Sequence, residues 1–305
     1  MKKWVVVSIN CLDIISLLSL EGIGRKRVGL ILKQYRNISL SIKDIYEILK
    51  DKNYYFTLKE LYQVYEKSKN IIEELNQSKI HMIDCLSTAY PDSLRKIEDP
   101  PLLLFIKGYY DFIYNEKNCL AVIGSREPTK KGKKTAYNIA RYLARKEFSI
   151  ISGLALGCDT QAHLACLKEK GRTAAILAHG LNMIYPKENE KLAQDIIDKG
   201  GCLISEYLPY EKAKNYTFIE RDRLQSALSQ AVIVIETEET GGTMHTVRFA
   251  KKQNKLLACV QYTPEQMQDY KLSGNKIILN ELNAIPVRNY EDLDDLITYL
   301  RENKS

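Results

Sequence analysis

Two short glycine loops are the residues of this 305-residue chain best suited to chemistry. The first, Gly124-Ser-Arg126, follows an apolar run at residues 119–123, and the second, residues 152–159, follows an apolar run at residues 149–151. A helical pattern comes after each loop, so both have the form of a strand, a phosphate-sized turn and a helix N-terminus. Neither loop has the GxGxxG or GxxxxGK[ST] spacing. We therefore expect a phosphate-bearing ligand that is neither a standard nicotinamide cofactor nor a hydrolysed nucleoside triphosphate.

Positive charge gathers beside the first loop. The formal net charge of the chain is +7, and residues 121–150 alone hold a large basic excess. Two interpretations fit: a solvated helix face, or a surface that attracts a polyanion. The basic residues are Arg126, Lys130, Lys131, Lys133, Lys134, Arg141, Arg145 and Lys146, against the acids Glu127 and Glu147.

Composition excludes several other classes of protein. The seven cysteines include no CxxC pair and the four histidines are dispersed, which indicates reduced core thiols and argues against a disulfide scaffold or a metal site. No cofactor is implied. There is no apolar run of about 18 residues and no small-residue cleavage site after the short apolar stretch at the N-terminus, so we expect a cytoplasmic protein with no membrane span and no signal peptide.

The N-terminal part, residues 1–78, is expected to be a small all-helical domain, because apolar residues recur at helical spacing between residues 10 and 78. Gly22-Ile-Gly24, followed by Arg25, Lys26 and Arg27, resembles the turn of a helix-hairpin-helix. Two interpretations stay open here. The turn's N–H groups could approach a DNA phosphate, or the turn could serve packing alone.

Residues 79–305 are expected to form a second domain of the α/β class. Pro91, Pro100 and Pro101 favour extended structure before residue 119, and strands then alternate with helices, which is typical of a mostly parallel sheet covered by helices. Because ligands bind at the carboxyl ends of such strands, the loops should meet in one crevice. The expected strands are residues 119–123, 149–152, 173–178, 201–205, 231–235 and 256–260, and the expected helices are residues 132–146, 160–169, 188–199, 220–229, 243–253 and 293–301.

The ordered loops resemble those of the DNA-processing protein A family, also called DprA or Smf. The resemblance spans residues 10 to about 262 and depends on the order and spacing of eight motifs, since one glycine loop alone would be a weak signal. The motifs are Tyr90-Pro91, Pro100-Pro101 with Lys107-Gly108, Gly124-Ser-Arg126, Ser152 to Asp159 with His163, Tyr185-Pro-Lys187, Ser205-Glu206, Arg221-Asp-Arg223 and Gly241-Gly-Thr243.

This resemblance implies an extended Rossmann-like domain that binds single-stranded DNA, usually as a homodimer, and loads the RecA recombinase during natural transformation. It implies no catalytic residues. Carried over by position, Ser125 and Arg126 match a loop that binds phosphate in the family. An arginine guanidinium suits this role because it can donate two parallel hydrogen bonds to phosphate oxygens. The DNA- and phosphate-binding residues expected on this basis are Gly124, Ser125, Arg126, Gly153, Gly157, Lys187, Arg221, Arg223, Gly241, Gly242 and Thr243.

Several neighbouring residues allow two interpretations each. Asp159 is either an N-cap of the following helix or a ligand contact, and His163 is either a packed core histidine or part of the site. Tyr216 and Phe218, which precede Arg221, could stack on bases or could reflect a Tyr-rich composition.

The chain departs from the family pattern at three places. Asp222 stands where the family usually has Asn, and residues 240–243 read Thr-Gly-Gly-Thr where a Ser-Gly-Ser type of sequence is usual. The latter is reminiscent of lysine-decarboxylase-like nucleotide phosphoribohydrolases, and with Glu206 and Glu236 it motivates a nucleotide-cleaving enzyme or a nucleotide sensor as the alternative. The winged-helix domain that many members carry at the C-terminus is not expected here.

Overall fold

The computed structural model describes residues 9–35 and 40–303. The stretch in which no signal peptide is expected, residues 1–10, lies mostly outside this described part. The chain divides into two compact units, Met1–Tyr90 with Pro100–Phe105, and Pro91–Asp99 with Ile106–Ser305. The domain boundary near residue 78 is a prediction that residues 1–78 fold on their own, and it stays a prediction.

Within residues 9–35 and 40–77, the elements of the first unit are helices, as the apolar spacing predicts. Each start is fixed locally: the side chains of Asn10, Ser41 and Thr57 accept backbone N–H groups of the first turns of α1, α3 and α4. A strand then follows, so the unit is not helical throughout. The elements are α1 (Cys11–Leu18), α2 (Arg25–Gln34), α3 (Ile42–Asp51), α4 (Leu58–Gln77), β1 (Ile80–Asp84) and the beginning of β2 (Leu103–Gly108).

The hairpin-like turn before α2 is engaged in contacts within its own unit. Ile23 is buried, the Arg27 guanidinium donates to the carbonyl of Gly22, and it also lies 5.2 Å from the ring centre of Tyr54. These contacts favour the packing interpretation of the turn.

The second unit is built on a parallel sheet. Along it the strands run in the order β6-β5-β4-β3-β7-β8-β9, and each neighbouring pair is parallel. The bounds are β3 (Cys119–Ile123), β4 (Ser149–Ser152), β5 (Thr173–Ile176), β6 (Cys202–Ser205), β7 (Ala231–Val234), β8 (Leu256–Val260) and β9 (Ile285–Val287).

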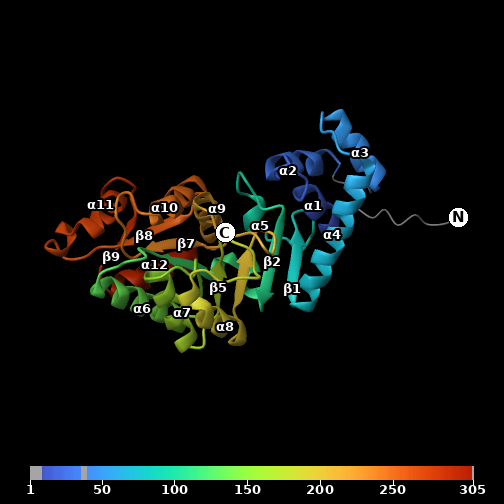
Figure 1. The fold of residues 1–305 in the computed structure, drawn as a ribbon. Helices are drawn as coiled ribbons and strands as arrows, with labels where there is room; N and C mark the ends of the chain where they lie inside the picture. The colour runs from blue at the N-terminus through green and yellow to red at the C-terminus, as the bar shows by residue number, and fades with distance from the viewer. Residues whose placement is uncertain (1–8, 36–39, 304–305) are drawn as a thin grey trace. The chain divides into compact units, whose positions relative to one another are not determined.

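Helices cover both faces of this sheet, which confirms the expected α/β fold class (Figure 1). Alternate residues of β3 show the two layers: Leu120 and Val122 pack toward α6, α7 and α12, whereas Ala121 and Ile123 pack toward α10 and α11. The helices are α5 (Asp92–Arg95), α6 (Lys130–Arg145), α7 (Cys158–Lys168), α8 (Glu190–Asp198), α9 (Asn215–Ala227), α10 (Thr243–Lys252), α11 (Ser273–Asn280) and α12 (Tyr290–Glu302).

The strand order reverses between β3 and β7. From β3 the chain moves outward through β4, β5 and β6, and from β7 it moves the other way through β8 and β9. A crevice opens at the carboxyl ends of the strands at such a switch point, because the two following loops diverge. The first glycine loop and the Thr240–Thr243 loop follow these two strands.

Two compositional expectations can be compared with the described residues. All seven cysteines are free thiols, and five of them are buried. No described helix combines the length and apolar character needed to cross a membrane.

Candidate nucleic-acid interface

A cleft of about 530 Å³ lies at the strand switch point. Its wall includes the end of β3, the loop after β4, one face of α9 and the beginning of α10. Of the residues expected to bind DNA, it brings together Gly124, Ser125, Arg126, Arg221, Gly241, Gly242 and Thr243.

The first glycine loop supplies the exposed cation of the cleft. The backbone N–H of Ser125 donates to the carbonyl of Glu236 at 2.7 Å, which fixes the loop against the end of β7. Arg126 is exposed, and its guanidinium carbon lies 4.7 Å from the ring centre of Phe218 on α9. The Phe218 ring also lies 5.9 Å from that of Tyr185. A positive group and two aromatic rings thus line the same wall.

The second glycine loop packs closely against the first one. Gly157 has φ of +79°, and a Cβ there would lie 2.6 Å from Pro128 Cδ and still closer to the carbonyl oxygens of Ser125 and Arg126. Only glycine fits this conformation and this approach without displacement. Gly153 is likewise close to the Arg221 guanidinium. Neither glycine lines the cleft, so their part is to hold the loops in place.

Asp159 ties the second loop together and does not cap α7. The N-cap of α7 is Gly157, and the Asp159 carboxylate accepts the N–H groups of Gly153 at 3.0 Å and Ala155 at 3.3 Å. Burial raises the pKa of this carboxyl, while Arg221 opposes the rise. Two of the loop N–H groups that could have held a phosphate, those of Gly153 and Ala155, are therefore bound to the protein's own carboxylate.

Another internal carboxylate occupies the N-terminus of α6. The backbone N–H and the hydroxyl of Thr129 donate to the two oxygens of Glu236 at 2.8 and 2.7 Å, and Glu236 is buried. This corrects the expectation of a simple strand, phosphate loop and helix N-terminus: an anion is already bound there.

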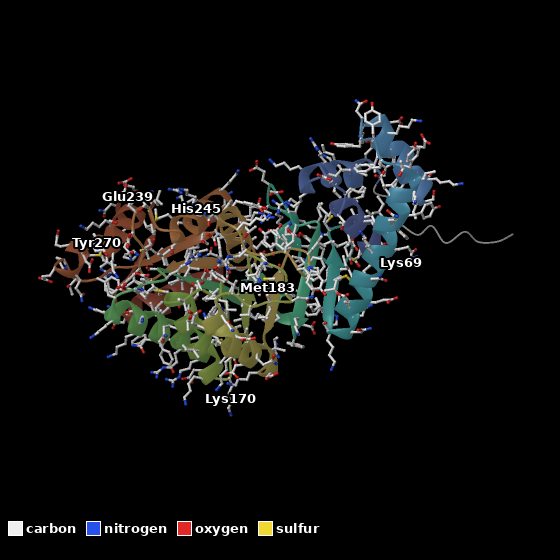
Figure 2. All side chains as sticks on the ribbon, viewed as in Figure 1. Lys69, Lys170, Met183, Glu239, His245 and Tyr270 are labelled. Atoms are coloured by element: carbon white, nitrogen blue, oxygen red, sulfur yellow. The ribbon has the colours of Figure 1, made fainter. Side chains whose placement is uncertain are left out.

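The beginning of α10 remains available to a ligand. Its N-cap, Gly242, makes no side-chain cap bond, and its first turn contains no acidic residue. A Cβ at Gly242 would meet no atom within 4 Å. His245, labelled in Figure 2 on the first turn of α10, also lines the cleft. The N–H groups of Met244 and His245 already donate to the carbonyls of Gly241 and Gly242, each at 3.0 Å, so it is the helix dipole that favours an anion at this position.

The remaining predicted cations have different surroundings. Arg221 lines the cleft, but it is buried and donates to the carbonyls of Gly153 and Ile176, linking the ends of β4 and β5. Arg223 is buried outside the cleft lining in a forked pair with Glu206, with Nη2 to Oε2 at 2.6 Å. Lys187 is exposed and does not line the cleft.

Asp222 and Gln225 form a polar group on the α9 side of the cleft. The Asp222 Oδ1 atom accepts Nε of Arg221 and Nε2 of Gln225, both at 3.0 Å. Burial raises the pKa of Asp222 to about 6, with the Arg221 charge acting in the opposite direction and the Asp159 charge adding to the rise. At neutral pH an anion therefore lies in the cleft near Arg126.

The basic segment is not concentrated at the cleft. Of its eight cations, all of which are described, Arg126 alone lines it. Arg141 and Arg145 pair with Glu169, and Lys146 pairs with Asp294. Because the rest of the segment is the helix α6, its side chains spread around the helix axis, and the solvated-face interpretation describes most of them.

His163 is a core histidine. It is fully buried, its Nδ1 lies 2.7 Å from the hydroxyl of Thr173, and burial lowers its pKa to about 3. The core interpretation of this residue is confirmed.

A comparison with known proteins bears on this geometry. A sequence model of the family described as DNA recombination-mediator protein A matches residues 81–298. The chain belongs to this family. A member in Bacillus subtilis, named DNA processing protein DprA, is 34% identical over 234 residues, which is 77% of each chain.

Two solved structures of the DprA family resemble this fold. The DprA structure from Streptococcus pneumoniae has a TM-score of 0.77 and 28% identity, covering 94% of this chain and 98% of that one. The DprA structure from Helicobacter pylori has a TM-score of 0.64 and 27% identity, covering 74% of this chain and 97% of that one, and that protein is described as having a unique single-stranded DNA binding mode.

Sequence reasoning missed part of the α9 wall of this DprA-family chain. Asn215, Ile219 and Gln225 line the cleft together with Phe218 and Asp222. Their spacing of three or four residues would have revealed a common helix face, but the helix was expected to start only near residue 220.

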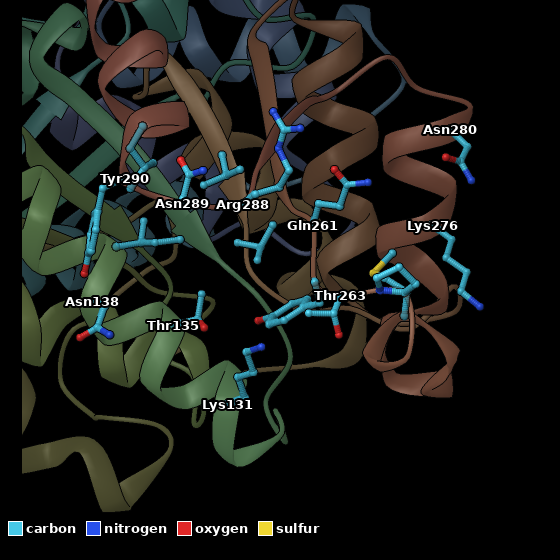
Figure 3. Close-up of a pocket in the computed structure, with 17 residues that line it drawn as sticks. Lys131, Thr135, Asn138, Gln261, Thr263, Lys276, Asn280, Arg288, Asn289 and Tyr290 are labelled. Carbon is cyan, nitrogen blue, oxygen red and sulfur yellow. The ribbon is translucent and has the colours of Figure 1, made fainter.

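A second cavity of about 830 Å³ lies beyond the carboxyl ends of β8 and β9 (Figure 3). Lys131, Lys276 and Arg288 supply its positive charges, and none of the predicted DNA-binding residues lines it. No sequence pattern predicted this cavity, because β9 is short and contains Pro286.

Proposed function

We propose that the chain binds single-stranded DNA in the cleft at the strand switch point. The observation that carries this proposal is the exposed Arg126 guanidinium, which lies on the Phe218 ring beside the uncapped start of α10. The guanidinium and the helix N-terminus suit phosphate oxygens, and the rings of Phe218 and Tyr185 suit base stacking. The single-stranded DNA binding mode described for the Helicobacter pylori protein supports this assignment.

The wider role we propose is that of a recombination mediator without catalysis. In the cytoplasm, a homodimer of the chain would cover a single strand and load RecA onto it during natural transformation, as the DprA resemblance implies. Light scattering of the purified protein measures the dimer, and co-purification with RecA in the presence and absence of a single strand measures the partnership.

The primary experiment is a fluorescence-anisotropy titration of a labelled oligo-dT at low and moderate salt, with a duplex competitor. Because phosphate contacts release counterions, the affinity should fall as salt rises, and the duplex should compete poorly. An absence of binding to the single strand at low salt would contradict the proposed function.

Arg126→Ala tests the location of the site. We expect it to weaken binding about tenfold or more, because a charge-assisted hydrogen bond contributes about 1.5–3 kcal/mol. Arg145→Ala is the matched control, since it removes the same charge from an exposed side chain that pairs with Glu169. Equal losses in the two variants would show that general charge, not this cleft, is responsible.

The alternative is a nucleotide-cleaving enzyme or a nucleotide sensor, which the Gly241-Gly242 loop at the cleft keeps open. The acids that motivated an enzyme are both engaged internally: Glu236 accepts the backbone N–H of Thr129, the N-cap of α6, and Glu206 pairs with Arg223. Release of a free base from a nucleoside monophosphate would support the enzyme, and tight binding of a small nucleotide without DNA affinity would support the sensor.

A further inference from the structure

The cavity beyond the carboxyl ends of β8 and β9 has cations but no carboxylate among the residues that line it. All of its lining residues are described, and they include Lys131, Lys276 and Arg288 but neither Asp nor Glu (Figure 3). The volume of about 830 Å³ lies within the usual range of ligand pockets. A wall with positive charge and without acids favours an anion. Neutral amide side chains complete the polar lining: Asn138, Gln261, Asn280 and Asn289.

Two of these cations are accessible and keep donors for a ligand. Lys276 is half-buried and has no hydrogen-bond or ion-pair partner among the residues that the structure describes. Lys131 is exposed, and its Nζ donates to Oε1 of Gln266 at 2.5 Å; an ammonium has three N–H donors, so two remain. Arg288, in contrast, is held in a forked pair by Asp292, with Nη2 to Oδ1 at 2.9 Å. The two lysines are therefore the groups that can bind a phosphate.

The start of α6, which carries Lys131, is basic where the helix dipole disfavours positive charge. Its first five residues include four lysines, and its first turn contains no acidic residue. Buried Glu236 supplies one carboxylate at this end of the helix. Cations at a helix N-terminus are destabilising, so a bound polyanion would offset the charge that remains. The four lysines are Lys130, Lys131, Lys133 and Lys134.

A smaller hollow of about 380 Å³ beside this cavity is less suited to a phosphate. It shares Lys131 and Tyr262 with the cavity, but Glu236, Glu265 and Asp269 also line it. Acidic side chains next to a phosphate are unfavourable because like charges repel. The cavity without acids is therefore the favoured place for the anion.

The cavity and the cleft lie along the same edge of the sheet. The cleft includes the loop after β3, the cavity lies at the ends of β8 and β9, and β3, β7, β8 and β9 are successive parallel neighbours. With about 4.8 Å between neighbouring strands, the ends of β3 and β9 are about 14 Å apart. At about 3.4 Å per nucleotide of a stacked strand, about four nucleotides bridge this distance.

We propose that the cavity binds a second segment of the single strand whose first segment lies in the cleft, with Lys131 and Lys276 as its phosphate contacts. This inference rests on the proposed function. Because phosphate contacts carry no sequence information, the second site adds affinity without a base preference. A strand of about 15 nucleotides reaches both sites, whereas one of about three nucleotides, about 10 Å long at the same rise, occupies one of them.

The test removes the two lysines together and varies the length of the strand. Fluorescence anisotropy measures the affinity of a labelled oligo-dT of about 15 nucleotides, and competition measures that of an oligo-dT of about three. Each phosphate contact on a single strand adds about 0.7 to the slope of log affinity against log salt, which is a factor of about five at about 0.1 M salt. The double variant Lys131→Ala, Lys276→Ala should therefore flatten the slope for the long strand by about 1.4 and weaken its binding about 10- to 30-fold at that salt. The affinity of the short strand should change less than about twofold, because the cleft remains.

Two further variants make the result specific. The double variant Lys168→Ala, Lys191→Ala removes the same charge from exposed lysines that line neither the cavity nor the cleft, so the salt slope should stay unchanged. Asn138→Asp keeps both cavity lysines but adds a carboxylate to the lining, so it should also weaken binding of the long strand. Equal effects of the two double variants, or equal losses for the long and the short strand, would overturn the inference alone. Failure of the unaltered protein to bind any strand would overturn the proposed function and the inference together.

Discussion

The buried Asp222 carboxyl should make the free energy of unfolding depend on pH. In the folded chain its pKa rises from 3.8 to about 6, chiefly because burial removes the charged form from water. Below pH 3.8 the carboxyl is protonated in both the folded and the unfolded chain, so it does not lower the free energy of unfolding. Between pH 4 and 6 the unfolded chain loses this proton first, so stability falls as pH rises and levels off above pH 6 to 7.

The size of this effect follows from the pKa difference. A rise from 3.8 to about 6 corresponds to a loss of about 3 kcal/mol of folding stability between acid and neutral pH. Asn at position 222 retains an oxygen for Arg221 and Gln225 but carries no charge. Asp222→Asn should therefore be more stable than the unaltered chain by about 3 kcal/mol at pH 8, and the difference should shrink toward zero near pH 3.5.

Urea unfolding followed by circular dichroism at intervals of half a pH unit measures this difference. Asp295→Asn, at an exposed aspartate of α12, is the control, and its curve should follow that of the unaltered chain. Parallel curves for Asp222→Asn and the unaltered chain from pH 4 to 8 would refute the reasoning, because they would show that ionising this carboxyl costs the folded state nothing.

Two further substitutions separate support of the fold from contact with DNA. Gly157→Ala should lower the free energy of unfolding by about 1–3 kcal/mol and weaken binding of oligo-dT, because the φ of +79° and the carbonyls of Ser125 and Arg126 leave no room for a Cβ. Urea unfolding measures the first effect and fluorescence anisotropy the second. A variant unchanged in both would contradict the packing described. Arg223→Met should lower the free energy of unfolding, measured in urea, by about 3–5 kcal/mol, because it removes the guanidinium that pairs with Glu206. The DNA affinity of the folded variant should hardly change. A large loss of affinity with little loss of stability would instead place Arg223 in the interface.

The sheet was predictable because its strands are buried on both faces. The bounds of β3, β4 and β8 agree with the apolar runs in the sequence, since continuous burial leaves a continuous apolar signal. The helix α9 begins earlier than expected, at Asn215. Its start depends on the Thr217 hydroxyl, which accepts the N–H of Lys214 at 2.9 Å inside an aromatic and β-branched stretch that does not favour a helix.

The members of the site were easier to predict than their contacts. The glycine loops and Arg126 lie where a parallel sheet requires, and their place follows from topology alone. The contact of Thr129 with Glu236 joins residues 107 positions apart, and no local pattern reveals it. The concentration of basic residues at 121–150 also did not locate the cleft, because the basic side chains of α6 do not line it.

Internal carboxylates determine which kind of anion the cleft accepts. Glu236 occupies the start of α6, and Asp159 occupies the N–H groups of the loop after β4. These two carboxylates use donors that a deep phosphate site of the dinucleotide type would need, whereas Arg126 and the start of α10 lie at the cleft wall. Donors in that position do not enclose a phosphate, so a strand can enter and leave with its flanking nucleotides attached. This geometry favours a polymer over a free nucleotide and is the structural reason to place DNA first.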